Sequence, residues 1–173
     1  MKIPQTNANC VNIKAKLVKN KSLRALPVLI GVLVFACSGI TQAVEIGTRT
    51  LKLSSAEPSA TNVSYELTID RASSGTLGSL QLEICTNDPF AGTPCTVPAG
   101  LSFSAASVLS QAGVSGFSVS GFTTPNSLIL TRTASAVAAG PLEITIGNVQ
   151  NPSNTGTYFG RIQTFASTDG SGA

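Results

Sequence analysis

The clearest hydrophobic pattern in the chain lies between Pro141 and Phe165, where two extended segments flank a run of turn-forming residues. In residues 142–146, Leu and Ile alternate with Glu and Thr, the period-two pattern of a strand with one face in a core and the other in water. Residues 147–156 are rich in Asn, Pro and Gly, which favour turns. Residues 156–165 regain aromatic and β-branched character. The pattern therefore predicts a strand, a long connection and a second strand.

The same alternation predicts further strands upstream and is most regular over residues 61–70. The full set of expected strands is 48–54, 61–70, 79–85, 116–122, 127–133, 142–146 and 156–165. Residues 98–113 predict instead one or two helical turns, because Ala and Leu are spaced as on one helix face and a glycine ends the run. Residues 134–140 predict an Ala-rich loop.

Seven strands with at most one short helix predict an all-β fold, a two-sheet antiparallel sandwich of immunoglobulin-like type. A small barrel is the alternative. Two immunoglobulin hallmarks are missing: the chain has no Trp, and Cys85 and Cys95 are too close in sequence to join two sheets. Because the turn-like residues 166–173 are followed by no strand, we also expect an open sheet edge if the chain is a fragment.

Residues 1–43 differ in composition from the remainder of the chain. A basic segment ending at Arg24 precedes the apolar run Leu26–Ala36, whose length is typical of a signal-peptide core. A membrane span needs about 20 apolar residues, so this run is short for one. Small residues at 41 and 43 match signal-peptidase recognition and predict cleavage between Ala43 and Val44. The predicted organisation is a signal peptide, 1–43, and a β-sandwich domain, 44–173.

Two other interpretations of this segment remain open. The apolar run extends weakly to Ile40 and is compatible with an uncleaved N-terminal anchor. Residues 34–37 also resemble a bacterial lipobox, in which Cys37 becomes an acylated first residue that holds the protein on a membrane. Phe35 departs from the small or aliphatic residue that is usual in that motif.

Charge and composition change once the leader is set aside. All eight acidic residues but only five of the eleven basic ones lie after Ala43, so the predicted domain is acidic although the whole chain carries +3. Five scattered basic residues form no patch for a phosphate backbone, which disfavours nucleic-acid binding. The composition rich in Ser, Thr, Gly and Ala is typical of exported β-proteins.

Cys85 and Cys95 are the two cysteines of the predicted domain, and they bracket the turn-rich loop TNDPFAGTP. Their position favours a disulfide formed in an oxidising compartment, with Cys85 on the outer side of a strand end. A redox or metal-binding pair is the competing interpretation. The nine-residue spacing fits neither a CxxC redox motif nor the usual zinc-ligand spacing.

Three segments resemble a known group of proteins: TNVSYELTI, IGNVQNPSNTGTYFGRIQTFAS and the acidic end at Asp169 and Gly170. They are similar to secreted, largely uncharacterised bacterial surface proteins built from immunoglobulin-like β-sandwich modules, in which NPS-x-x-GTY precedes a late strand. The resemblance spans Leu51–Asp169. It implies an exported sandwich and carries no catalytic or binding residues.

The residue types present in the chain exclude several classes of catalytic and metal-binding site. The chain has no His, which rules out Ser-His-Asp and Cys-His nucleophiles and His-ligated metals. Asp88 and Asp169 lie in loops and are calcium candidates, but neither has an acidic neighbour in its loop. Four strand carboxylates are candidates for a glycosidase pair, but we expect them on outward faces as solvated charges: Glu66, Asp70, Glu83 and Glu143. We therefore predict neither an enzyme nor a cofactor.

Lys52 is the single lysine of the predicted domain, and a lysine on a first strand can form an amide crosslink with a late asparagine such as Asn148. That reaction needs a buried lysine and a neighbouring carboxylic acid. Leu51 and Leu53 are expected to take the inner face and leave Lys52 in solvent, so no crosslink is predicted.

The sequence favours an exported, non-catalytic structural or adhesive module of the cell surface, with other surface proteins or glycans as partners and membrane contact only through the leader or a lipid anchor. The alternatives are a lipid-anchored surface protein and a glycan-binding module. For the second, the aromatic residues expected near loops are Phe90, Tyr158, Phe159 and Phe165. Sugars stack on such rings when they are exposed.

The first testable prediction concerns processing. We expect the exported protein to begin at Val44, because the basic, apolar and small-residue segments before it follow signal-peptide order. Intact mass and N-terminal sequencing of the exported product measure this directly. A product that begins at an acylated Cys37 would establish the lipoprotein interpretation instead.

Overall fold

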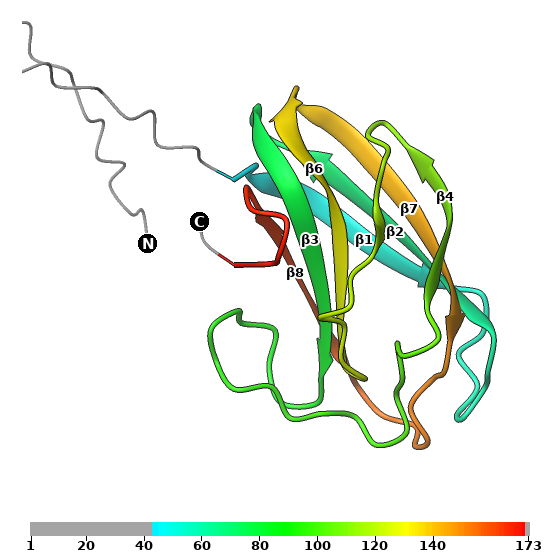
Figure 1. The fold of residues 1–173 in the computed structure, drawn as a ribbon. Helices are drawn as coiled ribbons and strands as arrows, with labels where there is room; N and C mark the ends of the chain where they lie inside the picture. The colour runs from blue at the N-terminus through cyan, green and yellow to red at the C-terminus, as the bar shows by residue number, and fades with distance from the viewer. Residues whose placement is uncertain (1–42, 172–173) are drawn as a thin grey trace, which may run out of the picture. The chain divides into compact units, whose positions relative to one another are not determined.

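The computed structural model describes residues 43–171 and forms an all-β sandwich (Figure 1). It contains eight strands and no helix within those residues. The strands are β1 (Ile46–Leu53), β2 (Val63–Arg71), β3 (Gly75–Cys85), β4 (Ser107–Ala112), β5 (Ser118–Val119), β6 (Ser127–Val137), β7 (Gly140–Val149) and β8 (Phe159–Phe165). The predicted two-sheet antiparallel fold is therefore confirmed, with eight strands in place of the seven expected.

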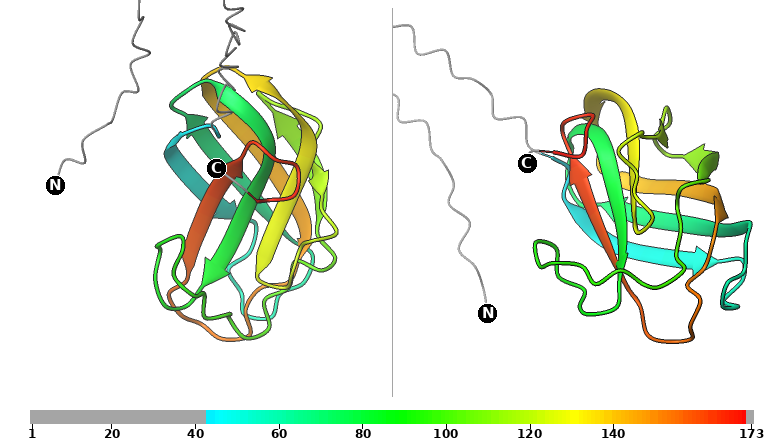
Figure 2. Two further views of the ribbon diagram at one scale, coloured as in Figure 1. Left: turned by 60° about the vertical axis from the view of Figure 1, so that its left-hand side comes forward. Right: turned by 60° about the horizontal axis from the view of Figure 1, so that its bottom comes forward.

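The strands form two sheets of four that lie face to face (Figure 2). The first sheet has the order β1-β2-β7-β4 and the second β5-β6-β3-β8, and every paired strand is antiparallel to its neighbour. Strands β1 and β8 are thus edge strands of different sheets.

The core is built from the alternating apolar rows of the central strands. In β2, for example, Leu67 and Ile69 are buried while Glu66 and Asp70 on the other face are exposed. The rows that meet between the sheets are Val63, Tyr65, Leu67 and Ile69 from β2, Leu142, Ile144 and Ile146 from β7, Leu77, Leu80, Leu82 and Ile84 from β3, and Leu128 and Leu130 from β6. Burying each Leu or Ile side chain contributes roughly 1.5–3 kcal/mol to stability.

A β-bulge in β7 extends this strand beyond its predicted end. Val63 pairs with Val149 and Tyr65 with Ile146, so two residues of β7, Gly147 and Asn148, lie opposite one residue of β2. Asn148 has a φ of 60°, a left-handed conformation that Asn adopts more readily than most residues. The extra residue returns Val149 to the core side, where it is fully buried.

The predicted helical turns in residues 98–113 are wrong, because Ser107–Ala112 forms the edge strand β4. This segment pairs with β7 from Gly147 to Glu143, with Leu109 as a bulge. The open backbone edge of β7 provides inter-strand hydrogen bonds, which outweigh the weak helical tendency of so short a segment.

The predicted Ala-rich loop 134–140 is also wrong over most of its length. Strand β6 continues to Val137 and β7 begins at Gly140, leaving a two-residue hairpin connection. Gly140 has a φ of 132°, which a residue with a side chain rarely adopts. Pairing of β6 with the early part of β3 holds the alanines extended despite their low strand preference.

The remaining boundaries shift by a few residues. The expected strand 116–122 reduces to β5, and β8 begins at Phe159 rather than at residue 156. After β8, the chain passes over β3 at Gly78, where an added Cβ would lie 2.4 Å from the carbonyl oxygen of Ser167. The Ser79 hydroxyl donates to the same carbonyl oxygen at 2.8 Å. The residues after β8 are thus packed against the second sheet.

Of the residues at the predicted cleavage point, Ala43 pairs with Thr76, and Val44 is buried. The carbonyl oxygen of Val44 accepts a hydrogen bond from the Thr164 hydroxyl. Cys37 and the rest of the leader lie outside the described residues, so the predictions of cleavage, anchoring and lipidation stay predictions. Within residues 43–171, no helix is long and apolar enough to cross a membrane.

The disulfide between Cys85 and Cys95 is present, with a Cα–Cα distance of 5.3 Å. Cys85 lies at the end of β3 as predicted, but its side chain is fully buried rather than on an exposed outer face. Cys95 Sγ lies 3.5 Å from the Asn126 amide nitrogen. The disulfide therefore also contacts the turn that precedes β6.

The second prediction concerns this disulfide. Replacing both cysteines with Ala should lower the free energy of unfolding by about 2.5–3 kcal/mol, because the unfolded chain regains the entropy of an open ten-residue loop. Chemical denaturation of the oxidised protein and the double variant measures this difference. Thiol titration of the unfolded, unreduced protein should find no free thiol from this pair, and two free thiols would contradict the assignment.

Candidate functional site

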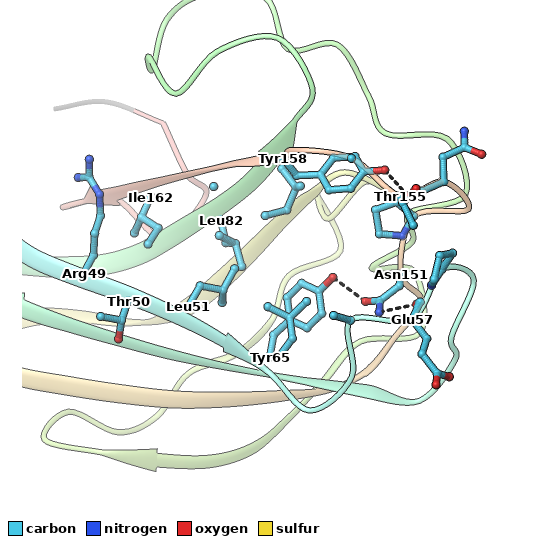
Figure 3. Close-up of a pocket in the computed structure, with 18 residues that line it drawn as sticks. Arg49, Thr50, Leu51, Glu57, Tyr65, Leu82, Asn151, Thr155, Tyr158 and Ile162 are labelled. Atoms are coloured by element: carbon cyan, nitrogen blue, oxygen red, sulfur yellow. Dashed lines mark hydrogen bonds between the residues drawn. The ribbon is translucent and has the colours of Figure 1, made fainter.

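A groove of about 630 Å³ lies between the edge strands β1 and β8, where the two sheets separate (Figure 3). Its walls include Leu51 of β1 and Ile162 of β8, with Leu82 and Ile84 of β3 at its base. Gly160 of β8 also lines the groove. An added Cβ at this position would make ordinary contacts with Ile84 and Leu51 at 3.7 and 4.0 Å. The groove is therefore largely apolar and has room for an added side chain.

Tyr65 and Asn151 close one end of the groove by hydrogen bonding to each other (Figure 3). The Tyr65 hydroxyl donates to Asn151 Oδ1 at 2.9 Å. Asn151 Nδ2 donates to the carbonyl oxygens of Ser55 and Glu57 at 2.9 and 3.0 Å. Burial raises the pKa of Tyr65 to about 12, so its hydroxyl stays protonated at neutral pH and acts as a structural donor.

The NPS sequence that begins at Asn151 joins three loops. The Asn151 backbone amide donates to Ala60 O, and Pro152 O accepts from the Ser59 amide, both at 2.9 Å. The Ser153 amide donates to Ala99 O at 2.7 Å. The polar atoms of this motif are thus engaged within the fold, and the groove contains no activated nucleophile or acid–base pair among its lining residues.

A second cluster surrounds Arg161 of β8, which is 3% exposed. Arg161 contacts the loop between Cys85 and Cys95, the two residues that the disulfide joins. Its Nη1 lies 3.1 Å from Glu83 Oε2, and its Nη2 lies 2.9 Å from Asp88 Oδ1. It also donates to the carbonyl oxygens of Asp88 and Thr93 at 3.1 and 2.8 Å and to the Thr93 hydroxyl at 3.1 Å. These five hydrogen bonds satisfy the buried guanidinium and fix the loop.

Asp88 is tied to the same loop by several donors. The Thr93 hydroxyl and the Phe90 amide each donate to Asp88 Oδ1 at 2.8 Å. The Thr93 bond, followed by the Phe90 amide and the charge of Arg161, lowers the pKa of Asp88 below its ordinary value. An oxygen already engaged by these donors is poorly placed for calcium.

The structure corrects the prediction for Glu83, which is not a free outward charge but the ion-pair partner of Arg161. Glu66, Asp70 and Glu143 lie on exposed faces as expected. In the part of the chain that the structure describes, Glu83 together with Cys85 and Cys95 is the one cluster with metal-ligand proximity. Because both sulfurs are in the disulfide and the carboxylate pairs with Arg161, this cluster is unsuited to a metal.

Two further predicted residues have surface roles. Lys52 is exposed, as expected, and its Nζ lies 3.5 Å from Glu66 Oε2. It therefore lacks the burial that an amide crosslink requires. Asp169 Oδ1 accepts hydrogen bonds from the hydroxyl and the amide of Ser171 at 2.7 and 3.0 Å. The Ser171 hydroxyl, followed by the nearby Ser167 hydroxyl, lowers the pKa of Asp169 to about 2. This keeps the Asp169 carboxylate within its own turn.

The aromatic residues predicted near loops divide into two groups. Tyr158, Phe159 and Phe165 are half-buried, and the Tyr158 hydroxyl donates to Asn154 O at 2.5 Å. Phe90, in contrast, is 69% exposed in the disulfide loop. Sequence analysis missed Phe122, which is 67% exposed in the turn before β6. Its position beside Thr-Thr-Pro-Asn is the signal that would have placed it in a turn.

No family model, curated protein or solved structure matches the chain.

The third prediction concerns the Arg161 cluster. Arg161→Met should lower the free energy of unfolding by about 3 kcal/mol or more, because Glu83 loses its partner and the loop loses its four hydrogen bonds to Arg161. Lys52→Met, which removes the same charge from an exposed pair, is the control and should cost less than about 1 kcal/mol. Similar losses in both variants, measured by denaturation, would contradict the structural role of Arg161.

The cluster also gives a pH dependence with a defined sign. Because folding lowers the pKa of Asp88 below its unfolded value of about 3.9, its contribution is present above that pH and is lost as the pH falls further. Asp169 contributes in the same direction between about pH 4 and 2. In Asp88→Asn, the free energy of unfolding should therefore fall less steeply as the pH drops below about 4, and the remaining fall should be the part that Asp169 contributes.

Proposed function

We propose that this protein is an exported, non-catalytic structural or adhesive module that acts at a cell surface. A disulfide is characteristic of an oxidising, extracytoplasmic compartment. Export itself is inferred from the leader. The resemblance to bacterial surface proteins with immunoglobulin-like modules is in keeping with this role, and lipid anchoring through Cys37 is its membrane-bound variant.

The observation that carries the adhesive role is that most of the exposed large apolar side chains lie at one end of the sandwich, which we call the adhesive end. Among the described residues, five large apolar side chains are exposed, and four of them are at this end: Leu53, Phe90, Val97 and Phe122. Leu53 ends β1 beside the groove, Phe90 and Val97 follow β3, and Phe122 lies in the turn leading to β6. Exposed aromatic side chains such as Phe90 and Phe122 can anchor a protein–protein contact by inserting into a pocket of the partner.

The loops that carry these side chains are held in place before any partner binds. The disulfide and Arg161 fix the loop with Phe90. The Phe122 amide donates to the Ser120 hydroxyl at 3.2 Å, and Asn126 contacts the disulfide. Pre-ordered loops lose little conformational entropy on binding, which favours affinity.

The second candidate is a glycan- or ligand-binding module that uses the groove between β1 and β8. The groove has the size and mostly apolar lining of many ligand sites, with the ring of Tyr158 on its wall. Against it, the hydroxyl of Tyr158 and the amide of Asn151 are already bonded within the fold. The adhesive end is therefore the better-supported site.

The fourth prediction tests the adhesive end. In a solid-phase assay of the exported protein on cell-envelope material from its own source, Phe90→Ser combined with Phe122→Ser should reduce retention by about tenfold or more, because truncating anchors costs 1–2 kcal/mol each. Leu109→Ser is the matched control, since Leu109 is 59% exposed on β4. Equal retention of the double variant and the parent would contradict an adhesive role for this end.

The same assay, run beside a glycan array, separates the two candidates. Gly160→Leu places a side chain in the groove, where an added Cβ would meet Ile84 and Leu51 at ordinary contact distances, and leaves Phe90 and Phe122 in the sequence. Under the adhesive proposal this variant is retained like the parent protein. Array binding that is lost in Gly160→Leu and kept in the Phe90 and Phe122 double variant would establish the glycan-binding alternative.

A further inference from the structure

A second pocket, of about 480 Å³, lies at the opposite end of the sandwich from the groove. It is formed where β2 ends at Arg71, beside the loop that begins at Gly113 and the hairpin between β6 and β7. Most of its lining residues have small side chains: Gly113, Ser115, Ser135, Ala136, Ala138, Ala139 and Gly140. Its two charged lining residues are both arginines, Arg71 and Arg132, and no acidic residue lines it.

Arg71 lies on the inward face of β2, where the alternating pattern of this strand predicts an apolar residue. It continues the buried row of β2 after Leu67 and Ile69 and is 5% exposed. Its Nη2 donates to Pro141 O at a long distance of 3.4 Å. Its Nε and Nη1 atoms are buried and have no hydrogen-bond acceptor within residues 43–171. A buried guanidinium with unpaired donors is costly, so its presence calls for a physical reason.

The charges around Arg71 do not compensate for the cost of burying its guanidinium. Burial is the main cause that lowers its pKa, the neighbouring Asp70 raises it, and Arg132 lowers it further. Asp70 lies on the exposed face of β2. An arginine stays protonated even when its pKa is lowered, so two positive charges remain at this pocket.

The fold provides partners for buried Arg161 and for half-buried Arg132. Arg161 has two carboxylates and five hydrogen bonds. Arg132 donates to Ser115 O, Leu77 O and the Ser135 hydroxyl at 3.0, 3.0 and 3.1 Å. Its guanidinium carbon also lies 5.7 Å from the centre of the Phe117 ring. Of these three arginines, only Arg71 has buried nitrogen atoms without an acceptor in the described residues.

We propose that this pocket binds an oxyanion, a carboxylate, phosphate or sulfate group, through the guanidinium of Arg71, which lines the pocket with Arg132 beside it. A guanidinium presents donors in a planar arrangement that matches such groups and supplies their countercharge. The small side chains leave space for close approach. Because the pocket is larger than one such group, the oxyanion belongs to a larger solute. This site goes beyond the adhesive role and lies at the other end of the molecule.

The test uses the exported protein with sodium phosphate, sulfate and acetate, each compared with sodium chloride at equal ionic strength. The preferred anion should raise the thermal unfolding midpoint in a saturable way, by roughly 10 °C at a hundredfold excess over Kd. Phosphate and sulfate against acetate distinguish a phosphate-like group from a carboxylate. No saturable response to any of the three would overturn the proposal.

Two variants and one spectroscopic measurement locate the effect. Arg71→Met should weaken anion binding at least tenfold while unfolding no more easily than the parent in chloride, because it removes an unpaired buried charge. Lys52→Met, which removes one exposed charge, should bind like the parent. In the unmutated protein, the NMR signals of Arg71 Nε and of the Gly113 and Gly140 amides should shift with the anion. An equal response in Arg71→Met, or shifts confined to other sites, would show only adventitious ion binding.

Discussion

The phase of the apolar alternation is the constraint on which the rest of the sandwich depends. The two sheets share a core only while the inward rows of β2 and β7 face those of β3 and β6, and a shift of one residue would turn a row toward water. The bulge at Asn148 corrects that phase where the sequence pattern breaks. It returns Val149 to the core, and the chain then continues to Asn151, whose side chain reaches Tyr65 and the β1–β2 loop. The end of the groove thus depends on one residue in a left-handed conformation.

Elements whose local pattern agrees with their pairing could be predicted from the sequence. Strand β2 alternates strictly and β7 alternates from Leu142 to Ile146, and both were expected at these positions. Strand β4 was missed because its short run of Ala, Val and Leu is equally compatible with a helix, and only the open edge of β7, more than thirty positions later, makes it a strand. The disulfide was predictable from two cysteines around a short turn-rich loop. The Arg161 cluster could not be predicted in this way. Its partners lie 68 to 78 positions away in the sequence, and an arginine in a strand is usually expected at the surface.

The domain after the predicted leader contains few charges, yet it places two arginines almost completely out of water. Burying a charge is unfavourable unless ion pairs and hydrogen bonds compensate for lost hydration. Around Arg161 they do, and the result is a rigid loop that presents Phe90. Around Arg71 the protein provides a single long hydrogen bond. Buried arginines therefore have opposite consequences at the two ends of the sandwich. Arg161 orders a loop at one end, whereas Arg71 at the other end has nitrogen atoms without acceptors.

The two ends are separated by the length of the strands that join them. Strand β2 runs from Val63, near the groove, to Arg71, and nine residues in extended conformation span roughly 26 Å. Substitutions this far apart, with no shared partner, are expected to have additive effects on stability and binding. The core between the two ends consists of apolar side chains packed in alternating rows, with neither end sharing a hydrogen-bond partner with the other. An adhesive contact and an oxyanion site can therefore operate on the same sandwich independently, each set by the loops at its own end.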